Sequence, residues 1–167
     1  HAAYETLYEA LSKVCDRAEG IIDLCGLSLG GVLAMQYAIE HPQKVRSLVL
    51  IAAQYKMPKG LLRLQNILFQ LMPNSMFQQT GLGKKAFIQL CKTMMKLDFS
   101  DSIKKIRCPT LVLYGERDSA NKKAALELAG ILKNAQLQVI SGAGHEINVE
   151  APEKLSGALR NFYKQIP

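Results

Sequence analysis

Hydrophobic positions along the chain alternate between helical spacing and short, continuous apolar runs. Apolar residues recur every three or four positions from Tyr4 to Val14, which predicts an amphipathic helix that ends by Gly20. Short runs that predict strands occupy 21–25, 47–52, 110–114 and 137–141, and the continuous apolar run at 47–52 is typical of a strand covered on both faces. Helical patterns occupy 29–40, 60–72, 83–97, 120–133 and 152–164.

This strand–helix alternation predicts an α/β fold with about four parallel strands, flanking helices and a helical insert. We expect one domain over residues 1–167. Asp23 is an acid within the first apolar run, and we expect it near the strand's entry, within reach of water. Ligand sites in open α/β sheets lie beyond the carboxyl ends of the strands, so residues that follow each run are the candidates for chemistry.

Composition narrows the class of protein. Hydrophobic residues make up 49% and charged residues 21%, which are ordinary globular values and argue against disorder. No apolar run approaches the roughly 18 residues of a membrane span, so we expect no integral membrane segment. The four cysteines lack C-x-x-C spacing, which argues against a metal site. We expect them to be reduced, buried thiols in a cytoplasmic protein, and Cys25 is one of them.

Positive charge is concentrated in one segment. The net charge is +7, and between Lys56 and Arg107 there are ten Lys or Arg against two acids, Asp98 and Asp101. Such a segment suits an anionic substrate, an anionic membrane surface or nucleic acid, or it is simply a solvated helix surface. No nucleic-acid motif or aromatic interleaving accompanies it, so we expect no nucleic-acid partner.

The residues Gly26-Leu27-Ser28-Leu29-Gly30 match the pattern G-x-S-x-G between a predicted strand and a predicted helix. A tight strand-to-helix turn lifts a serine hydroxyl clear of the backbone, and flanking glycines avoid side-chain clashes there. The N–H groups of the helix that starts at Leu29 would stabilise a developing oxyanion. The competing interpretation is a glycine-rich turn that happens to contain serine.

A nucleophilic serine needs a base and an orienting acid. His145 follows the fourth strand run and a Gly-Ala-Gly loop, whereas His1 is terminal and His41 precedes Pro42 at a helix end. Asp118 follows the third strand run, and Glu116 is its competitor. We therefore predict Ser28, His145 and Asp118 as nucleophile, base and acid.

Three segments together resemble the α/β-hydrolase superfamily, in its lipase/esterase, lactonase and C–C hydrolase branch. They are G-L-S-L-G-G at 26–31, R-C-P-T-L-V-L-Y-G-E-R-D at 107–118 and G-A-G-H-E-I-N-V-E-A-P-E at 142–153. The resemblance implies the chain order Ser, Asp, His and a helical lid at 54–107. It also implies that the family's first four strands and its His-Gly loop are absent, which leaves Leu29 N–H as the one matching oxyanion donor.

The predicted activity is cleavage of an ester, lactone or related small carbonyl substrate through an acyl-enzyme, with no metal or cofactor. Met94 and Met95 would line an acyl pocket, although methionine also serves as core filler. Ser28 argues against a dehalogenase, which uses a carboxylate nucleophile. The alternative is a weakly active or non-catalytic fragment that acts as an interaction or dimerisation module, with a homodimer paired through an exposed edge strand at 21–25.

Overall fold

The computed structural model describes residues 3–75, 81 and 83–166, which form two compact units. We call residues 1–17 and 56–98 the helical unit, and residues 18–55 and 99–167 the sheet unit. The helical unit contains α1 (Tyr4–Arg17), α3 (Lys59–Leu71) and α4 (Lys84–Met94). The sheet unit contains β1 (Ile22–Leu27), α2 (Leu29–Glu40), β2 (Val45–Ile51), η2 (Ile103–Lys105), β3 (Thr110–Gly115), α5 (Ser119–Ile131), β4 (Ala135–Ile140), α6 (Ile147–Glu150) and α7 (Pro152–Tyr163).

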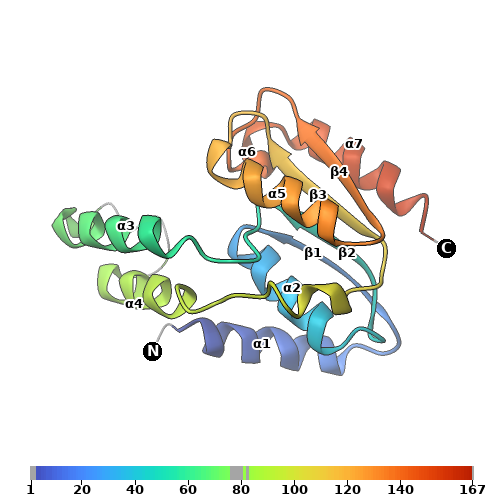
Figure 1. Cartoon of the computed structure of the whole chain (residues 1–167), viewed down its shortest axis with the longest axis horizontal. Coiled ribbons are helices and arrows are strands. Elements are labelled where there is room, and N and C mark those ends of the chain that lie inside the picture. The colour runs from blue at the N-terminus through green and yellow to red at the C-terminus, as the bar shows by residue number, and fades with distance from the viewer. Residues whose placement is uncertain (1–2, 76–80, 82, 167) are drawn as a thin grey trace. The chain divides into compact units, whose positions relative to one another are not determined.

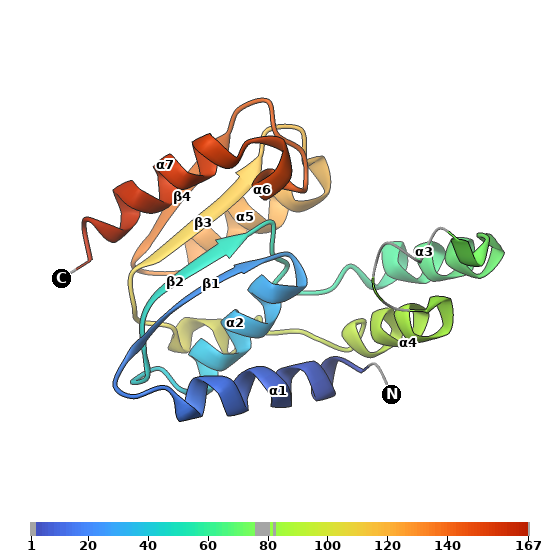
Figure 2. The same ribbon diagram turned by 180° about the vertical axis from the view of Figure 1, so that it is seen from behind.

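The four strands form one parallel sheet in the order β1-β2-β3-β4 (Figure 1). This confirms the four parallel strands with flanking helices predicted from the apolar runs. Helices α2 and α5 lie on one face, and α7 lies on the other (Figures 1 and 2). Because both faces of β2 and β3 are covered, nearly every residue of these two strands is buried.

The core between the sheet and α7 is apolar and closely packed. One cluster of buried residues joins Val49 and Ile51 of β2, Leu111 and Leu113 of β3, and Phe162 of α7. At 25 cal/mol per Å² of apolar area, fully burying such side chains stabilises the fold by about 1.5–3 kcal/mol each. This packing fixes the sheet that carries the candidate site.

Strand β1 differs from the prediction in two respects. The strand continues through Gly26 to Leu27 instead of ending at Gly26, since Gly26 pairs with Leu50 and Leu27 with Ile51. Cys25 is exposed rather than buried. The reason is that β1 is an edge strand of the described sheet and α7 does not cover its outer part.

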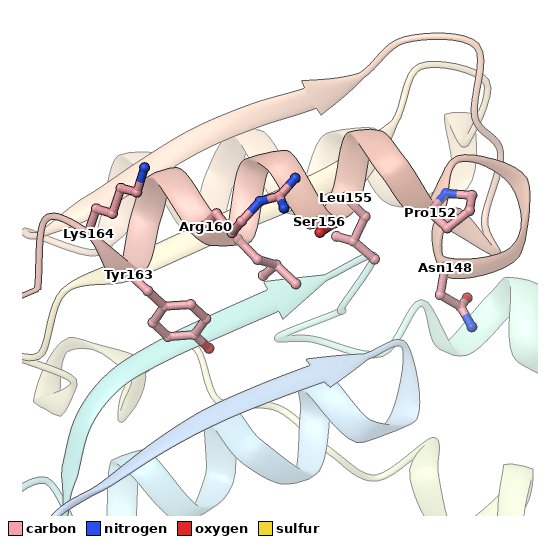
Figure 3. A pocket seen from close by; sticks show the side chains of 8 residues that line it. Asn148, Pro152, Leu155, Ser156, Arg160, Tyr163 and Lys164 are labelled. Atoms are coloured by element: carbon pink, nitrogen blue, oxygen red, sulfur yellow. The ribbon is translucent and has the colours of Figure 1, made fainter.

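An open groove runs beside α7 on this uncovered side (Figure 3). Its volume is about 540 Å³, and its lining includes Leu155, Leu159 and Tyr163. The Tyr163 side chain extends from α7 toward the strands (Figure 3). Burial, followed by the nearby Cys25 and Asp23, raises the pKa of Tyr163 to about 12.

The helical unit is held together by contacts between α3 and α4 and between α1 and α4. The ring centroids of Phe69 and Phe87 lie 5.4 Å apart in an edge-to-face arrangement. Lys84 Nζ donates to the carbonyls of Gln70, in α3, and Met72, just beyond it. Residues 76–80 and 82 of the predicted insert lie outside the described residues. None of the helices in the described residues is long and apolar enough to cross a membrane.

Asp23 is solvent-accessible, as expected, and it ties β1 to β2. Its carboxylate forms an ion pair with Arg46 and accepts a hydrogen bond from Ser47 Oγ at 2.6 Å. Hydrogen bonding from the Arg46 guanidinium, against the opposing effect of burial, holds the pKa of Asp23 below its usual value.

We predict that Asp23→Asn lowers stability at neutral pH and that the deficit shrinks in acid. A carboxyl whose pKa is depressed on folding stabilises the fold above its unfolded pKa, near ~3.9, and loses that contribution as pH falls through the folded value. Urea unfolding of both proteins at pH 7 and below pH 4 measures this effect. Asp101→Asn is the control for removal of an exposed carboxylate, and equal stability of wild type and Asp23→Asn at pH 7 contradicts the prediction.

Candidate active site

Ser28 occupies a strained turn between β1 and α2. Its backbone angles are φ 52° and ψ −117°, a region that residues with a Cβ rarely adopt. The turn is held by backbone hydrogen bonds from Ser28 N–H to the Ile51 carbonyl at 2.7 Å and from Val32 N–H to the Ser28 carbonyl at 3.1 Å. Leu29 is the first residue of α2, so its N–H is among those that an α-helix leaves without an internal partner.

The glycines around Ser28 have different roles from those that the G-x-S-x-G pattern suggests. A Cβ on Gly26 would overlap the backbone of Gly30 and Gly31, and one on Gly31 would lie 2.7 Å from Ala53 Cβ. A Cβ on Gly30 would have nothing within 4 Å. The close approach of β1 to α2 therefore depends on the absence of side chains at Gly26 and Gly31. At Gly30 the structure leaves room for a side chain.

Asp118 is the N-cap of α5 and is almost fully buried, with its side chain 5% exposed. Its Oδ2 lies 2.9 Å from His145 Nδ1. A buried carboxylate is best satisfied when Nδ1 carries the proton and donates it, which leaves His145 Nε2 as a free acceptor. The structure thus brings together the predicted acid and base in the orientation that general-base chemistry requires.

Glu116, the competing acid, lies elsewhere in the same turn. Its carboxylate accepts a hydrogen bond from Gly142 N–H at 2.8 Å, at the start of the loop that carries His145. Glu116 therefore holds this loop near the end of β3 and does not orient the imidazole.

Asn121 is a site residue that the sequence reasoning missed. Its Nδ2 donates to both carboxylate oxygens of Asp118, at 3.0 and 2.8 Å, and lies 3.2 Å from His145 Nδ1. Gln54, which follows β2, fixes this amide by donating to Asn121 Oδ1 at 2.8 Å. The Asn121 amide thus satisfies the buried Asp118 carboxylate and orients it toward His145, and Gln54 holds the Asn121 amide in place.

Glu150 is a second missed residue, and it supports the loop that carries His145. Its carboxylate accepts hydrogen bonds from the backbone N–H groups of Gly144 and Glu146, the neighbours of His145, and pairs with Arg117 at 2.9 Å. These contacts restrict the loop on both sides of the histidine, whose side chain is 45% exposed.

The predicted catalytic residues lie in the sheet unit, and the predicted substrate contacts lie in the helical unit. Ser28, Asp118 and His145 follow β1, β3 and β4 at the carboxyl edge of one sheet, and Asp118 and His145 are in contact. Within the described residues, the Ser28 hydroxyl makes no hydrogen bond with His145, a contact that in free enzymes is often long before substrate binds. Met94 ends α4 in the helical unit, and Met95 lines a cleft there with four basic residues. No three His, Cys, Asp or Glu gather as a metal-binding group in the described part of the chain.

The profile of the Alpha/beta hydrolase family matches residues 1–158. The chain belongs to this family. The turn at Ser28 and the pair of Asp118 and His145 therefore lie in an alpha/beta hydrolase sheet.

Relatives with assigned names are distant. The chain is 23% identical over 164 residues to mouse monoacylglycerol lipase ABHD6, a match that covers 86% of this chain and 49% of the mouse protein. It is 26% identical over 177 residues to the biotin biosynthesis bifunctional protein BioHC of Cellvibrio japonicus, covering 86% of this chain and 35% of that protein. The chain thus spans about half the length, or less, of these curated relatives.

Two solved structures of other proteins have the same fold. A thermophilic esterase from Thermogutta terrifontis superposes with a TM-score of 0.79 at 23% identity, covering 99% of this chain and 73% of the esterase. The enol-lactonase of Burkholderia xenovorans LB400 superposes with a TM-score of 0.76 at 18% identity, covering 98% and 74%. At these identities, the similarity shows the fold of the chain. Its chemistry has to be inferred from its own residues.

We predict that Gly26→Ala and Gly30→Ala have opposite effects on stability. Gly26→Ala forces a methyl group into backbone atoms and should lower the free energy of unfolding by about 3 kcal/mol or more. Gly30→Ala adds a methyl group in open space within a helix and should raise it by about 0.5–1 kcal/mol. Urea unfolding of the two variants measures both effects, and similar losses at the two positions would be inconsistent with the observed close approach.

Proposed function

We propose that this chain is a serine hydrolase that cleaves an ester, lactone or related carbonyl compound through an acyl-enzyme. The observation that carries the proposal is the 2.9 Å contact of the buried Asp118 with His145, at the same sheet edge as the strained turn of Ser28. The names of similar proteins, which include lipases, an esterase and an enol-lactonase, agree with this class of chemistry.

The residues have the following roles in the proposed reaction. Ser28 Oγ attacks the substrate carbonyl carbon while His145 Nε2 takes the hydroxyl proton, and Asp118 stabilises the resulting imidazolium. Leu29 N–H donates to the oxyanion of the tetrahedral intermediate. His145 then returns the proton to the leaving group, and a water molecule activated by the same imidazole releases the acyl group from Ser28.

Asn121 and Gln54 are positioning residues in this scheme. With both oxygens of Asp118 bonded to the Asn121 amide, the carboxylate cannot turn away from His145 without losing a buried hydrogen bond. Because Asn121 is neutral, it satisfies Asp118 without competing with the imidazolium as a cation would.

Other parts of the proposal concern the surroundings of the site. We assign residues 54–107 as a lid, and Met94 and Met95 as contacts for an apolar acyl group, since thioethers adapt to varied apolar shapes. A small carbonyl compound is the proposed substrate. Four free cysteines fit a reducing compartment, which makes the cytoplasm the proposed location.

A second candidate function, self-association, is favoured by the exposed edge of β1. Within the described sheet, β1 pairs with β2 alone, so its outer edge is unpaired, and Cys25 of this strand is exposed. The opposite edge strand, β4, carries the exposed Leu137 and Val139 beside Gln136 and Gln138. An unpaired edge favours pairing with another chain, so two copies would join through β1 about a two-fold axis.

We predict that a serine-directed phosphonate labels wild-type protein and that Ser28→Ala abolishes the labelling. His145→Gln should slow labelling by about 10³-fold or more, because the serine hydroxyl then lacks its base. His41→Gln is the matched control, since His41 stacks on Tyr37 at the end of α2. Mass spectrometry of the labelled peptide measures both effects. Labelling of Ser28→Ala at the wild-type rate, or equal losses in the two histidine variants, would refute the proposed roles.

We predict that the chain sediments as a dimer at micromolar concentration and that Cys25→Lys converts it to a monomer. A lysine on an edge strand opposes edge-to-edge pairing because its charge would have to be buried. Gln138→Lys places the same charge on the β4 edge and should leave the dimer intact. Analytical ultracentrifugation distinguishes these results, and a monomeric wild-type chain would exclude pairing through β1.

A further inference from the structure

Four basic side chains line a cleft between α3 and α4 in the helical unit. Lys59 and Arg63 of α3 face Lys92 of α4 and Lys96 just beyond it, around a volume of about 330 Å³. None of the four forms an ion pair in the described part of the chain. The single acid between residues 56 and 98 is Asp98, and it pairs with Lys56 at 3.5 Å.

This arrangement places like charges next to one another. Lys59 and Arg63 stand four residues apart within α3, which is the spacing at which side chains of a helix are neighbours, and like charges at this spacing destabilise a helix. Lys92 of α4 and Lys96, which lies beyond the end of α4, add two more positive charges around the same cleft. An anion with several acceptor oxygens relieves this repulsion, and a phosphate group has that chemistry.

Apolar side chains are exposed further along α3. Ile67, Leu68 and Leu71 are 57%, 52% and 80% exposed. Counting in steps of four from Lys59 and Arg63 leads to Ile67 and Leu71, so basic and apolar residues follow one another along one side of the helix. At 1.5 Å per residue, Arg63 and Leu71 are about 12 Å apart along the helix axis.

We propose that the α3–α4 pair binds the surface of an anionic phospholipid membrane. The basic cleft takes the lipid phosphates, and Ile67, Leu68 and Leu71 enter the boundary between headgroups and acyl chains. Interfacial helices combine these two features, an apolar side and Lys or Arg beside it, without spanning the bilayer. This property is independent of the chemistry at Ser28.

The exposed leucines and isoleucine distinguish a lipid surface from other anions. A free phosphate or a nucleic acid would satisfy the four cations, yet it would leave the apolar residues of α3 in water. A membrane that is anionic at its surface and apolar beneath it accounts for both observations.

Vesicle co-sedimentation with the full chain tests the proposal. We expect binding to vesicles of phosphatidylcholine mixed with phosphatidylserine, weak binding to phosphatidylcholine alone, and loss of binding at high salt. Replacing Lys59, Arg63, Lys92 and Lys96 with Gln should weaken binding at least about tenfold. The matched control replaces Lys104, Lys105, Arg107 and Lys133 of the sheet unit with Gln, which removes the same charge and should retain most of the binding.

A second pair of variants tests the apolar contribution. Ile67→Gln with Leu71→Gln should weaken binding to the mixed vesicles, whereas Val14→Gln with Leu126→Gln, which are exposed apolar residues elsewhere, should not. Circular dichroism verifies that each variant is folded. Equal binding of the two four-charge variants, equal binding to both vesicle types, or titration of the cleft by inorganic phosphate or by duplex DNA without any vesicle binding would each overturn the proposal.

Discussion

The candidate site depends on one constraint, which is that the four strands β1, β2, β3 and β4 all run parallel in one sheet. In a parallel sheet every strand ends at the same edge, so residues that follow β1, β3 and β4 converge although they are far apart in sequence. Each turn at that edge then has its own local support. Gly26 and Gly31 allow the turn of Ser28, Asn121 and Gln54 hold Asp118, and Glu150 restrains the loop of His145.

Much of this arrangement could be predicted from sequence because its causes are local. Strands β2 and β3 are covered on both faces, so their sequences are continuous apolar runs, and the turn of Ser28 has a short glycine pattern. The exposure of Cys25 could not be predicted, since burial on β1 depends on what lies beyond the strand's outer edge. The importance of Gly31 over Gly30 depends on the position of Ala53, which no short motif records.

Asn121, Gln54 and Glu150 were missed for a related reason. Amides and carboxylates at the starts of helices and in loops are common, and nothing in their local sequence separates a surface residue from a support of the site. One signal was available in principle. Asp118 needed further donors once it was placed at a buried sheet edge, and Asn121 stands three residues later, within reach of an N-cap carboxylate. A complete account of the hydrogen bonds of a predicted buried acid would have pointed to it.

The proposed triad lies in the sheet unit, whereas the proposed membrane-binding residues lie in the helical unit, which also holds the proposed acyl contacts Met94 and Met95. The proposed nucleophile, base and acid all belong to the sheet unit, where the packed core fixes the strands that they follow. The basic cleft and the exposed apolar residues belong to the helical unit. Holding an enzyme at a surface raises the local concentration of any substrate dissolved there, as tethering does for two linked binding sites, and requires no new contact at the serine. The unequal charge of the two units is thus consistent with both proposals, in which the helical unit binds the membrane surface and the sheet unit carries the hydrolytic residues.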